Sequence, residues 1–176
     1  MLKKMALGLA VVLALLLAYA TTRPDSFRVE RSTRIQAPPA KVYGLLNDFH
    51  HFPRWSPWEK LDPKMTTQHS GSASGKGAVY TWDGNDDVGA GRMEILQTTP
   101  DCQVTVQVDF FKPFAARNTS EYTITAQGDT TTVTWAMFGP SPYVSKLMGV
   151  FVSMDRMIGK DFERGLSNLK AAAEAP

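Results

Sequence analysis

Cysteine is almost absent from this chain, in which Cys102 has no second cysteine to pair with. One thiol cannot form an intrachain disulfide or supply the several thiolates that hold a structural zinc ion. Histidine is scarce as well, because His50, His51 and His69 are the only three. Neighbours on a helix diverge by about 100°, so His50 and His51 need a third ligand from elsewhere to hold a metal. We therefore expect no metal and no cofactor, and histidines that are solvated or packed in the core.

An excess of one charge is also missing. The chain has 19 basic and 17 acidic residues, which gives a formal net charge of +2. Lys3 and Lys4 account for this excess, and both precede an apolar leader. Without them the two signs balance, so nothing attracts a polyanion and nucleic acid is not an expected partner.

Phosphate-binding motifs are missing too. The stretch "GSASGKG", residues 71–77, is rich in glycine but lacks the spacing of a phosphate loop. Its lysine is followed by glycine instead of Ser or Thr, and no helical pattern comes after it. We interpret this stretch as the turn of a β-hairpin.

The chain does contain an uncharged run of sixteen residues, from Met5 to Ala20. As a helix it would be about 24 Å long, against about 30 Å of bilayer hydrocarbon. Lys3 and Lys4 favour an inside N-terminus, which puts the rest of a bacterial chain in the periplasm. Two interpretations stay open, an uncleaved anchor and a signal peptide cut after Ala20, and we favour the anchor. We assign residues 1–22 to this segment and residues 23–26 to a spacer.

Most of the remaining chain alternates apolar and polar residues, which is typical of half-buried strands. In "CQVTVQVDFF", for example, Val104, Val106 and Val108 share one face. Gly128 and Asp129 form a hairpin signal between two such runs. The alternation predicts about seven strands, in the ranges 27–35, 64–70, 78–84, 88–99, 102–111, 116–127 and 130–139.

Helical spacing occurs in two places. Residues 37–49 carry two prolines where a first helical turn tolerates them, and the pattern predicts a helix that ends near Asn47 or Asp48. A second short helical turn should follow within "FHHFPRWSPWEKLDP", residues 49–63. After Pro142, apolar residues recur every three or four positions, which predicts one helix of about eight turns with any bend at Gly159. These apolar residues are Leu147, Val150, Phe151, Met154, Met157, Ile158, Phe162, Leu166 and Leu169.

This order of elements indicates an α+β fold in one domain, residues 27–173. A curved antiparallel sheet has one apolar face that must be covered, and the C-terminal helix is the only segment long enough. A twisted sheet curled around one helix leaves a gap between them. Two short helices after the first strand would roof that gap.

Three stretches carry a family resemblance: "RVERSTRIQAPPAKVYGLLNDFHHFPRWSPWEK", "GRMEI" and "GKDFERGLSNLK". With the order of elements, they resemble the SRPBCC superfamily, the START/Bet v 1-like helix-grip proteins. In particular, residues 27–172 resemble the bacterial polyketide cyclase/dehydrase and lipid-transport-like subgroup. The resemblance implies a hydrophobic cavity between the sheet and the C-terminal helix.

A set of aromatic, methionine and aliphatic residues is the best candidate for the lining of such a cavity. Methionine adapts to variable apolar shapes, and Tyr and Trp add a polar group that can orient a ligand. Solid core packing would explain the same residues about equally well. The candidate ligand-binding residues are Trp58, Tyr80, Trp82, Met93, Val106, Val108, Phe110, Tyr122, Trp135, Met137, Met154, Met157 and Ile158.

The corner "WSPW", Trp55 to Trp58, is stiffened by Pro57 and has no general base or metal set beside it. We expect it to act as a structural plug of the sheet's mouth, or else as a wall that contacts ligand. Strand charges such as Arg92, Glu94 and Asp109 should form a salt-bridged outer face.

We expect a binding module for a small hydrophobic ligand, such as a lipid or polyketide-like molecule, with a membrane contact through the N-terminal segment. The first alternative is a cyclase/dehydratase-type enzyme, which needs an acid or base inside the pocket. The second is a chaperone-cofactor-like interaction module, which needs a large exposed apolar patch. Catalytic residues are not identifiable from the sequence.

Overall fold

The structure is a computed structural model that describes residues 2–176. Helix α1 (Leu2–Thr21) precedes strand β1 (Ser26–Ile35), helix α2 (Pro39–Leu46) and the 3₁₀ helix η1 (Phe49–Arg54). Six strands follow, namely β2 (Thr66–Gly71), β3 (Ala78–Asp83), β4 (Ala90–Thr99), β5 (Gln103–Lys112), β6 (Ala116–Gln127) and β7 (Thr130–Pro140). Helices α3 (Tyr143–Met148) and α4 (Met154–Glu174) complete the chain.

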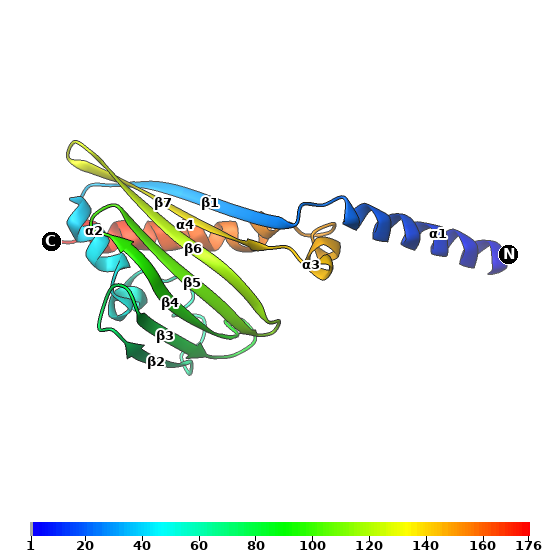
Figure 1. Cartoon of the computed structure of the whole chain (residues 1–176), viewed down its shortest axis with the longest axis horizontal. Coiled ribbons are helices and arrows are strands. Elements are labelled where there is room, and N and C mark those ends of the chain that lie inside the picture. Colours follow the sequence, from blue (N-terminus) through cyan, green and yellow to red (C-terminus); the bar gives the residue numbers. More distant parts are fainter. Residues whose placement is uncertain (1) are drawn as a thin grey trace.

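The strands form one antiparallel sheet in the order β1-β7-β6-β5-β4-β3-β2. The sheet is curved, and α4 lies along its concave face, behind the sheet in Figure 1. On β5 the buried residues are Val104, Val106 and Val108, while the residues between them face outward. The seven strands and the α+β helix-grip arrangement predicted from the sequence are confirmed.

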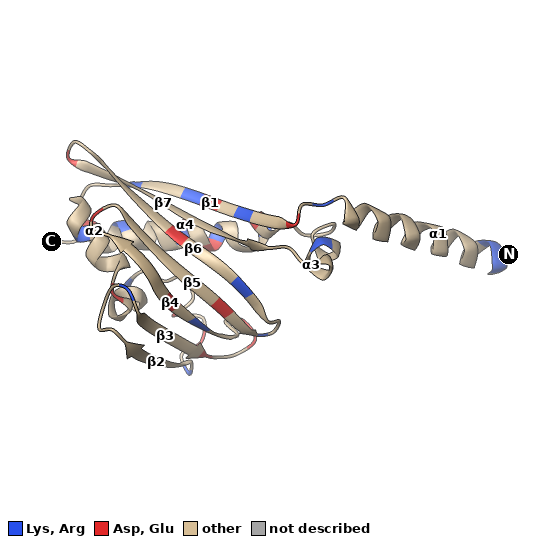
Figure 2. Cartoon of the chain, viewed as in Figure 1, with Lys and Arg blue, Asp and Glu red and all other residues tan. Residues whose placement is uncertain are grey.

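The charged outer face is also confirmed. Arg92 pairs with Glu94 at 2.7 Å, and Arg117 pairs with Asp109 at 2.6 Å. Figure 2 shows charges of both signs distributed over this face of the sheet. These groups neutralise one another at the surface and point away from the interior.

Helix α2 and η1 close one end of the sheet. Pro39 begins α2, which buries Val42, Leu45 and Leu46. Asp48 then caps η1, because its side chain accepts a hydrogen bond from the backbone N–H of His50. The two short helical elements predicted between the first two strands are therefore present.

The prediction of one C-terminal helix of about eight turns was wrong. The segment forms two helices, and residues 149–153 break the helical path between them. The side chain of Ser153 accepts a hydrogen bond from the N–H of Arg156, so α4 begins with its own cap. Apolar spacing continues across the break, which is why periodicity alone did not reveal it.

Gly159, where we expected any bend, lies inside the continuous α4. A Cβ atom there would lie 2.2 Å from a guanidinium nitrogen of Arg31. Arg31 crosses from β1 and pairs with Asp155 and Glu163 of α4, both at 2.8 Å. Glycine at 159 therefore permits a close approach between β1 and α4.

The antiparallel registers place several loops at one end of the molecule. Ser26 at the start of β1 pairs with Pro140 at the end of β7, and Ala90 at the start of β4 pairs with Lys112 at the end of β5. We call this end the anchor pole; it contains the β3–β4 loop, the β5–β6 turn, α3 and the first turn of α4. Helix α1 extends outward from it, as Figure 1 shows.

Helix α1 is exposed along nearly its whole length. Residues 3–21 are long and apolar enough to cross a membrane, with a mean hydropathy of 2.0. A retained anchor and a signal sequence both fit such a helix at the N-terminus.

Candidate ligand-binding pocket

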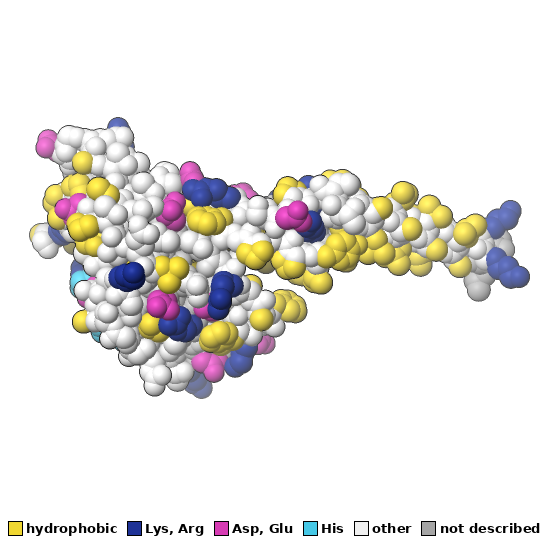
Figure 3. Space-filling view, in the orientation of Figure 1, with side chains coloured by type: hydrophobic (Ala, Val, Ile, Leu, Met, Phe, Trp, Pro, Cys, Tyr) yellow, Lys and Arg dark blue, Asp and Glu magenta, His cyan; other side chains and the backbone are white. Residues whose placement is uncertain are grey.

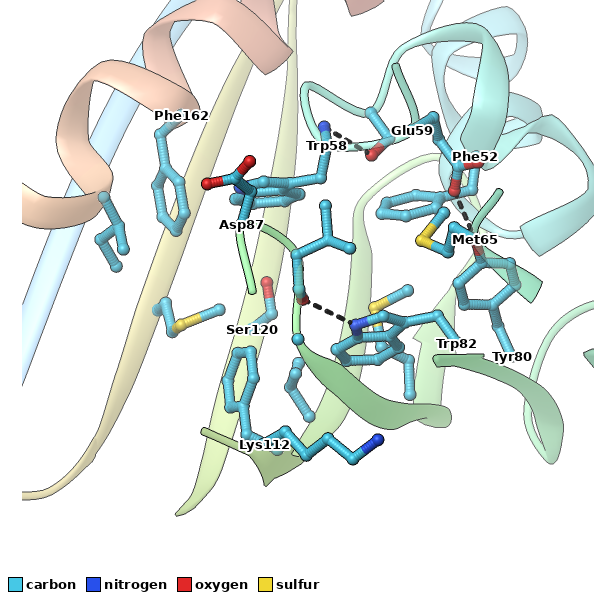
Figure 4. A pocket seen from close by; sticks show the side chains of 18 of the residues that line it. Phe52, Trp58, Glu59, Met65, Tyr80, Trp82, Asp87, Lys112, Ser120 and Phe162 are labelled. Atoms are coloured by element: carbon cyan, nitrogen blue, oxygen red, sulfur yellow. Dashed lines mark hydrogen bonds between the residues drawn. The ribbon is translucent and has the colours of Figure 1, made fainter. Parts of the chain in front are cut away.

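A cavity of about 230 Å³ lies between the sheet and α4. Strands β3 to β7 supply its floor, Ile158 and Phe162 of α4 supply one wall, and the segment after η1 supplies the other. Figure 4 shows Trp58, Phe162, Trp82 and Tyr80 around this space. The lining is mainly apolar, as burial of an apolar ligand requires.

Trp135 of β7 is the centre of the aromatic wall. Its ring stacks on Phe162 with centroids 4.0 Å apart, and Trp58 approaches it edge-on at 5.9 Å. The indole N–H of Trp135 donates to the hydroxyl of Ser120 at 2.7 Å, so its one polar atom is satisfied while buried. These contacts fix the ring planes that border the cavity.

Glu59 and Tyr80 form a polar pair at the cavity wall. The hydroxyl of Tyr80 donates to Oε1 of Glu59 at 2.5 Å, a bond drawn in Figure 4. Burial, together with this bond and the nearby carboxylate charge, raises the pKa of Tyr80 far above its ordinary value. Tyr80 is therefore a neutral hydrogen-bond donor at any physiological pH, and Glu59 is the acceptor.

Charged side chains surround the cavity mouth. Asp86 and Asp87 of the β3–β4 loop and Lys112 at the end of β5 are exposed lining residues. The indole N–H of Trp82 donates to the carbonyl of Val88 at 3.1 Å, which ties the β3–β4 loop to the cavity wall. The mouth thus opens at the anchor pole.

The structure brings ten of the thirteen candidate ligand-binding residues together around this cavity. They are Trp58, Tyr80, Trp82, Met93, Val108, Phe110, Tyr122, Trp135, Met137 and Ile158. Val106 is instead buried in the hydrophobic core. Met154 is partly buried and packs against that core. Met157 is 51% exposed, because it precedes Ile158 by one residue and so points about 100° away around the helix.

Sequence reasoning missed Glu59, Asp86 and Asp87 because they lie in loops without a repeating pattern. It also missed Ser120, a small polar residue on a predicted strand, which lines the cavity and accepts the hydrogen bond from Trp135. Phe162 was recognised in the sequence as an apolar residue of the C-terminal helix, four positions after Ile158. It was not included among the candidate ligand-binding residues. Further lining residues outside the prediction are Phe52, Ser56, Met65, Val88, Gly89, Lys112 and Pro113.

The two tryptophans of the corner have different positions. Trp55 is 3% exposed, and its indole N–H donates to the carbonyl of Leu45. Trp58 is only partly buried and lines the cavity. Trp55 therefore fills the core beneath α2, whereas Trp58 borders the ligand space.

The histidines lie outside the cavity. His50 bonds to Asp48, and its ring stacks on His69 with centroids 4.3 Å apart. His51 contacts the carbonyl of Gly44. Among the described residues, no group of three or more His, Cys, Asp or Glu side chains is arranged to hold a metal ion.

Several solved structures share this fold. Major latex-like protein 151 from Panax ginseng has a TM-score of 0.63 and 15% identity, covering 86% of this chain and 100% of that chain. The di-domain ARO/CYC protein BexL of the BE-7585A biosynthetic pathway has a TM-score of 0.60 and 15% identity, covering 91% of this chain and 54% of that chain. The Aha1 dimer from Colwellia psychrerythraea has a TM-score of 0.56 and 18% identity, covering 84% of this chain and 96% of that chain. At these identities the likeness shows the fold alone.

No curated protein matches the sequence. Residues 26–174, however, match the family described as polyketide cyclase / dehydrase and lipid transport. That match spans every element from β1 to the end of α4, including all the walls of the cavity. The chain therefore belongs to the polyketide cyclase/dehydrase and lipid transport family, within the SRPBCC helix-grip superfamily.

Proposed function

We propose that the protein binds a small hydrophobic ligand, such as a lipid or polyketide-like molecule, in the cavity between the sheet and α4. The observation that carries the proposal is the cavity itself, which is walled by aromatic and methionine side chains and open at one pole. Binding gains about 25 cal/mol for each Å² of apolar surface removed from water. The Glu59–Tyr80 pair supplies the polar contact that orients the ligand.

The cavity volume limits the ligand. Sites for drug-sized molecules occupy about 300–1,000 Å³, and this cavity of about 230 Å³ is smaller. A compact molecule fits within it, or one end of a longer chain whose remainder passes through the mouth. We propose that α1 tethers this module to the cytoplasmic membrane as a single span, with the domain on the periplasmic side. Cleavage after Ala20 would instead release it to the periplasm.

The test fills the cavity. Val108→Phe adds volume inside the pocket, whereas Gln107→Phe adds the same ring on the outer face of the same strand. A dansyl-labelled fatty acid serves as the probe, and energy transfer from the pocket tryptophans reports binding. We expect Val108→Phe to weaken binding at least about tenfold and Gln107→Phe to leave it unchanged. Equal affinity in both variants and the wild type would contradict the proposal.

The Glu59–Tyr80 pair also favours a second candidate function, a cyclase/dehydratase-type enzyme. In that reaction Glu59 takes a proton from a carbon beside a carbonyl, and Tyr80 positions the carboxylate. The resulting enolate carbon attacks a second carbonyl within the same chain, and the alkoxide that forms takes the proton back from Glu59. Glu59 then removes a second proton from the attacking carbon and returns it to the hydroxyl group, which leaves as water. We expect Glu59→Gln to abolish conversion of a poly-β-ketone while probe binding stays within about twofold. If the wild type releases no dehydrated ring product, the enzyme function is wrong.

A further inference from the structure

The anchor pole carries an exposed apolar patch that the cavity does not use. Five residues of α3 and the break after it have large exposed side chains: Tyr143, Val144, Met148, Phe151 and Val152. Phe151 is 68% exposed and Val144 is 66% exposed. Soluble monomers rarely expose contiguous apolar surface of this kind. We call these five residues the α3 patch.

The α3 patch lies directly beside α1. The hydroxyl of Tyr143 donates to the backbone carbonyl of Leu17 at 3.0 Å. Leu17 belongs to the apolar helix, four residues before Thr21, which is about 6 Å along the axis. Figure 3 shows apolar side chains continuing from α1 onto the adjoining end of the domain. If α1 crosses a bilayer, α3 must lie at the level of the bilayer edge.

The connection between α1 and the domain is short and held in place. The backbone oxygen of Asp25 accepts a hydrogen bond from the N–H of Ser141 at 2.7 Å, and the Asp25 carboxylate pairs with Lys146 of α3. One bond joins the spacer to the residues just before α3, and the other joins it to the last turn of α3. They keep the α3 patch next to the outer end of α1.

The cavity mouth opens at the same pole. Its exposed lining residues belong to the β3–β4 loop, the end of β5 and the β5–β6 turn, and Ile158 lies just beyond the first turn of α4. Phe111 near the end of β5 and Phe114 in the β5–β6 turn are also exposed, the latter at 71%. An apolar ligand that leaves the cavity at this pole meets apolar side chains.

We propose that the α3 patch lies in the headgroup–acyl boundary of the bilayer that holds α1, and that this contact turns the cavity mouth toward the lipid from which ligand is loaded. The inference rests on the proposed hydrophobic-ligand function and on the proposed membrane tether. Aromatic and aliphatic side chains are typical of elements that lie at this boundary. The bilayer is favoured over a protein partner because the patch continues the apolar surface of α1.

The test measures the depth of single labelled positions in full-length protein reconstituted into bilayers of phosphatidylcholine and phosphatidylglycerol. Cys102 is exposed in the β4–β5 turn at the opposite pole, so the wild-type chain labelled with the fluorophore NBD is a natural water-exposed control. In a Cys102→Ser background, Phe151→Cys reports the α3 patch and Leu9→Cys reports α1. Nitroxide-labelled lipids quench only a fluorophore that reaches the membrane.

We expect strong lipid quenching at positions 9 and 151, and none at position 102. Quenching at 9 without quenching at 151 would overturn the proposal and leave the tether intact. A label at 151 that neither lipid nitroxide nor aqueous iodide quenches would show that a protein or a second copy covers the patch, which also overturns it. Absence of quenching at both 9 and 151 would overturn both the membrane contact of the α3 patch and the tether. The Val108→Phe measurement tests the ligand function separately.

A second measurement connects the patch to loading. Phe151→Asp should slow transfer of the dansyl fatty acid from vesicles into the cavity about tenfold, because a charge is excluded from the boundary layer. Phe151→Leu keeps the apolar contact and should load at the wild-type rate. The equilibrium affinity should stay the same in both variants, since residue 151 does not line the cavity. Equal loading rates in the two variants would contradict the coupling.

Discussion

Trp55 and Trp58 show how two similar residues, three positions apart, take different roles. Trp55 contacts Phe52, Tyr122 and Trp135 edge-on and has no access to the cavity. Trp58 contacts Trp135 from the cavity side. The prolines of the sequence predict a stiff corner here. The sequence could not show which ring points inward, because that depends on where β7 lies beneath the corner.

The two tryptophans should separate stability from binding. We expect Trp55→Ala to lower the free energy of unfolding by about 3–5 kcal/mol, because it leaves a large cavity in the core. Trp58→Ala should cost less and should weaken binding of the dansyl fatty acid. Thermal unfolding and probe titration of both variants measure this. Unchanged probe affinity in Trp58→Ala would show that Trp58 is also only a structural plug.

Gly165 permits α4 to approach the central ring. A Cβ atom there would lie 2.7 Å from Cζ3 of Trp135. We expect Gly165→Ala to cost about 1–3 kcal/mol of stability through overpacking, despite the better helix propensity of alanine. Gly44 of α2 is the matched control, since nothing lies within 4 Å of its added Cβ. Gly44→Ala should be neutral or stabilising by up to about 1 kcal/mol. Chemical denaturation of both variants measures this, and an equal change in the free energy of unfolding for Gly165→Ala and Gly44→Ala would refute the packing argument.

At the scale of elements, the strands were predictable because half-buried strands must alternate, and their bounds follow that alternation closely. The break between α3 and α4 was not predictable from periodicity. Val150 and Phe151 have the correct spacing for α4, yet both lie in the break before it, and Phe151 belongs to the α3 patch. Apolar residues that face another helix and apolar residues that face the core have the same pattern in the sequence.

The ion pairs of Arg31 join β1 to α4 and should make stability depend on pH. The hydrogen bond from Arg31, helped by the attraction of its charge, holds the pKa of Asp155 below its ordinary value of 3.8, although burial acts in the opposite direction. The stabilisation is therefore fully present above that value and is lost as the pH falls through the lower, folded-state pKa. Arg31→Met should be less stable than the wild type at neutral pH. The difference in melting temperature between Arg31→Met and the wild type should begin to shrink as the pH falls below about 4. A constant difference from pH 7 down to pH 2 would contradict this account.

At the scale of the whole molecule, the order of strands places the cavity mouth, the α3 patch and α1 at one pole. The cavity was predictable in its apolar wall, because strand alternation identifies inward residues. Its polar pair and its mouth were not, because Glu59, Asp86 and Asp87 lie in loops whose path depends on the folded sheet. The family match suggests hydrophobic ligand binding or polyketide cyclase/dehydrase activity, and the cavity gives the proposed binding function a location.

The central claim is that this cavity holds a small apolar molecule. Native mass spectrometry of the full chain released from membranes in a mild detergent, followed by lipid extraction, tests it most directly. We predict a wild-type chain that retains one small apolar molecule, a Gln107→Phe variant that also retains it, and a Val108→Phe variant that does not. A wild-type chain that carries no molecule and binds no dansyl fatty acid would contradict the claim.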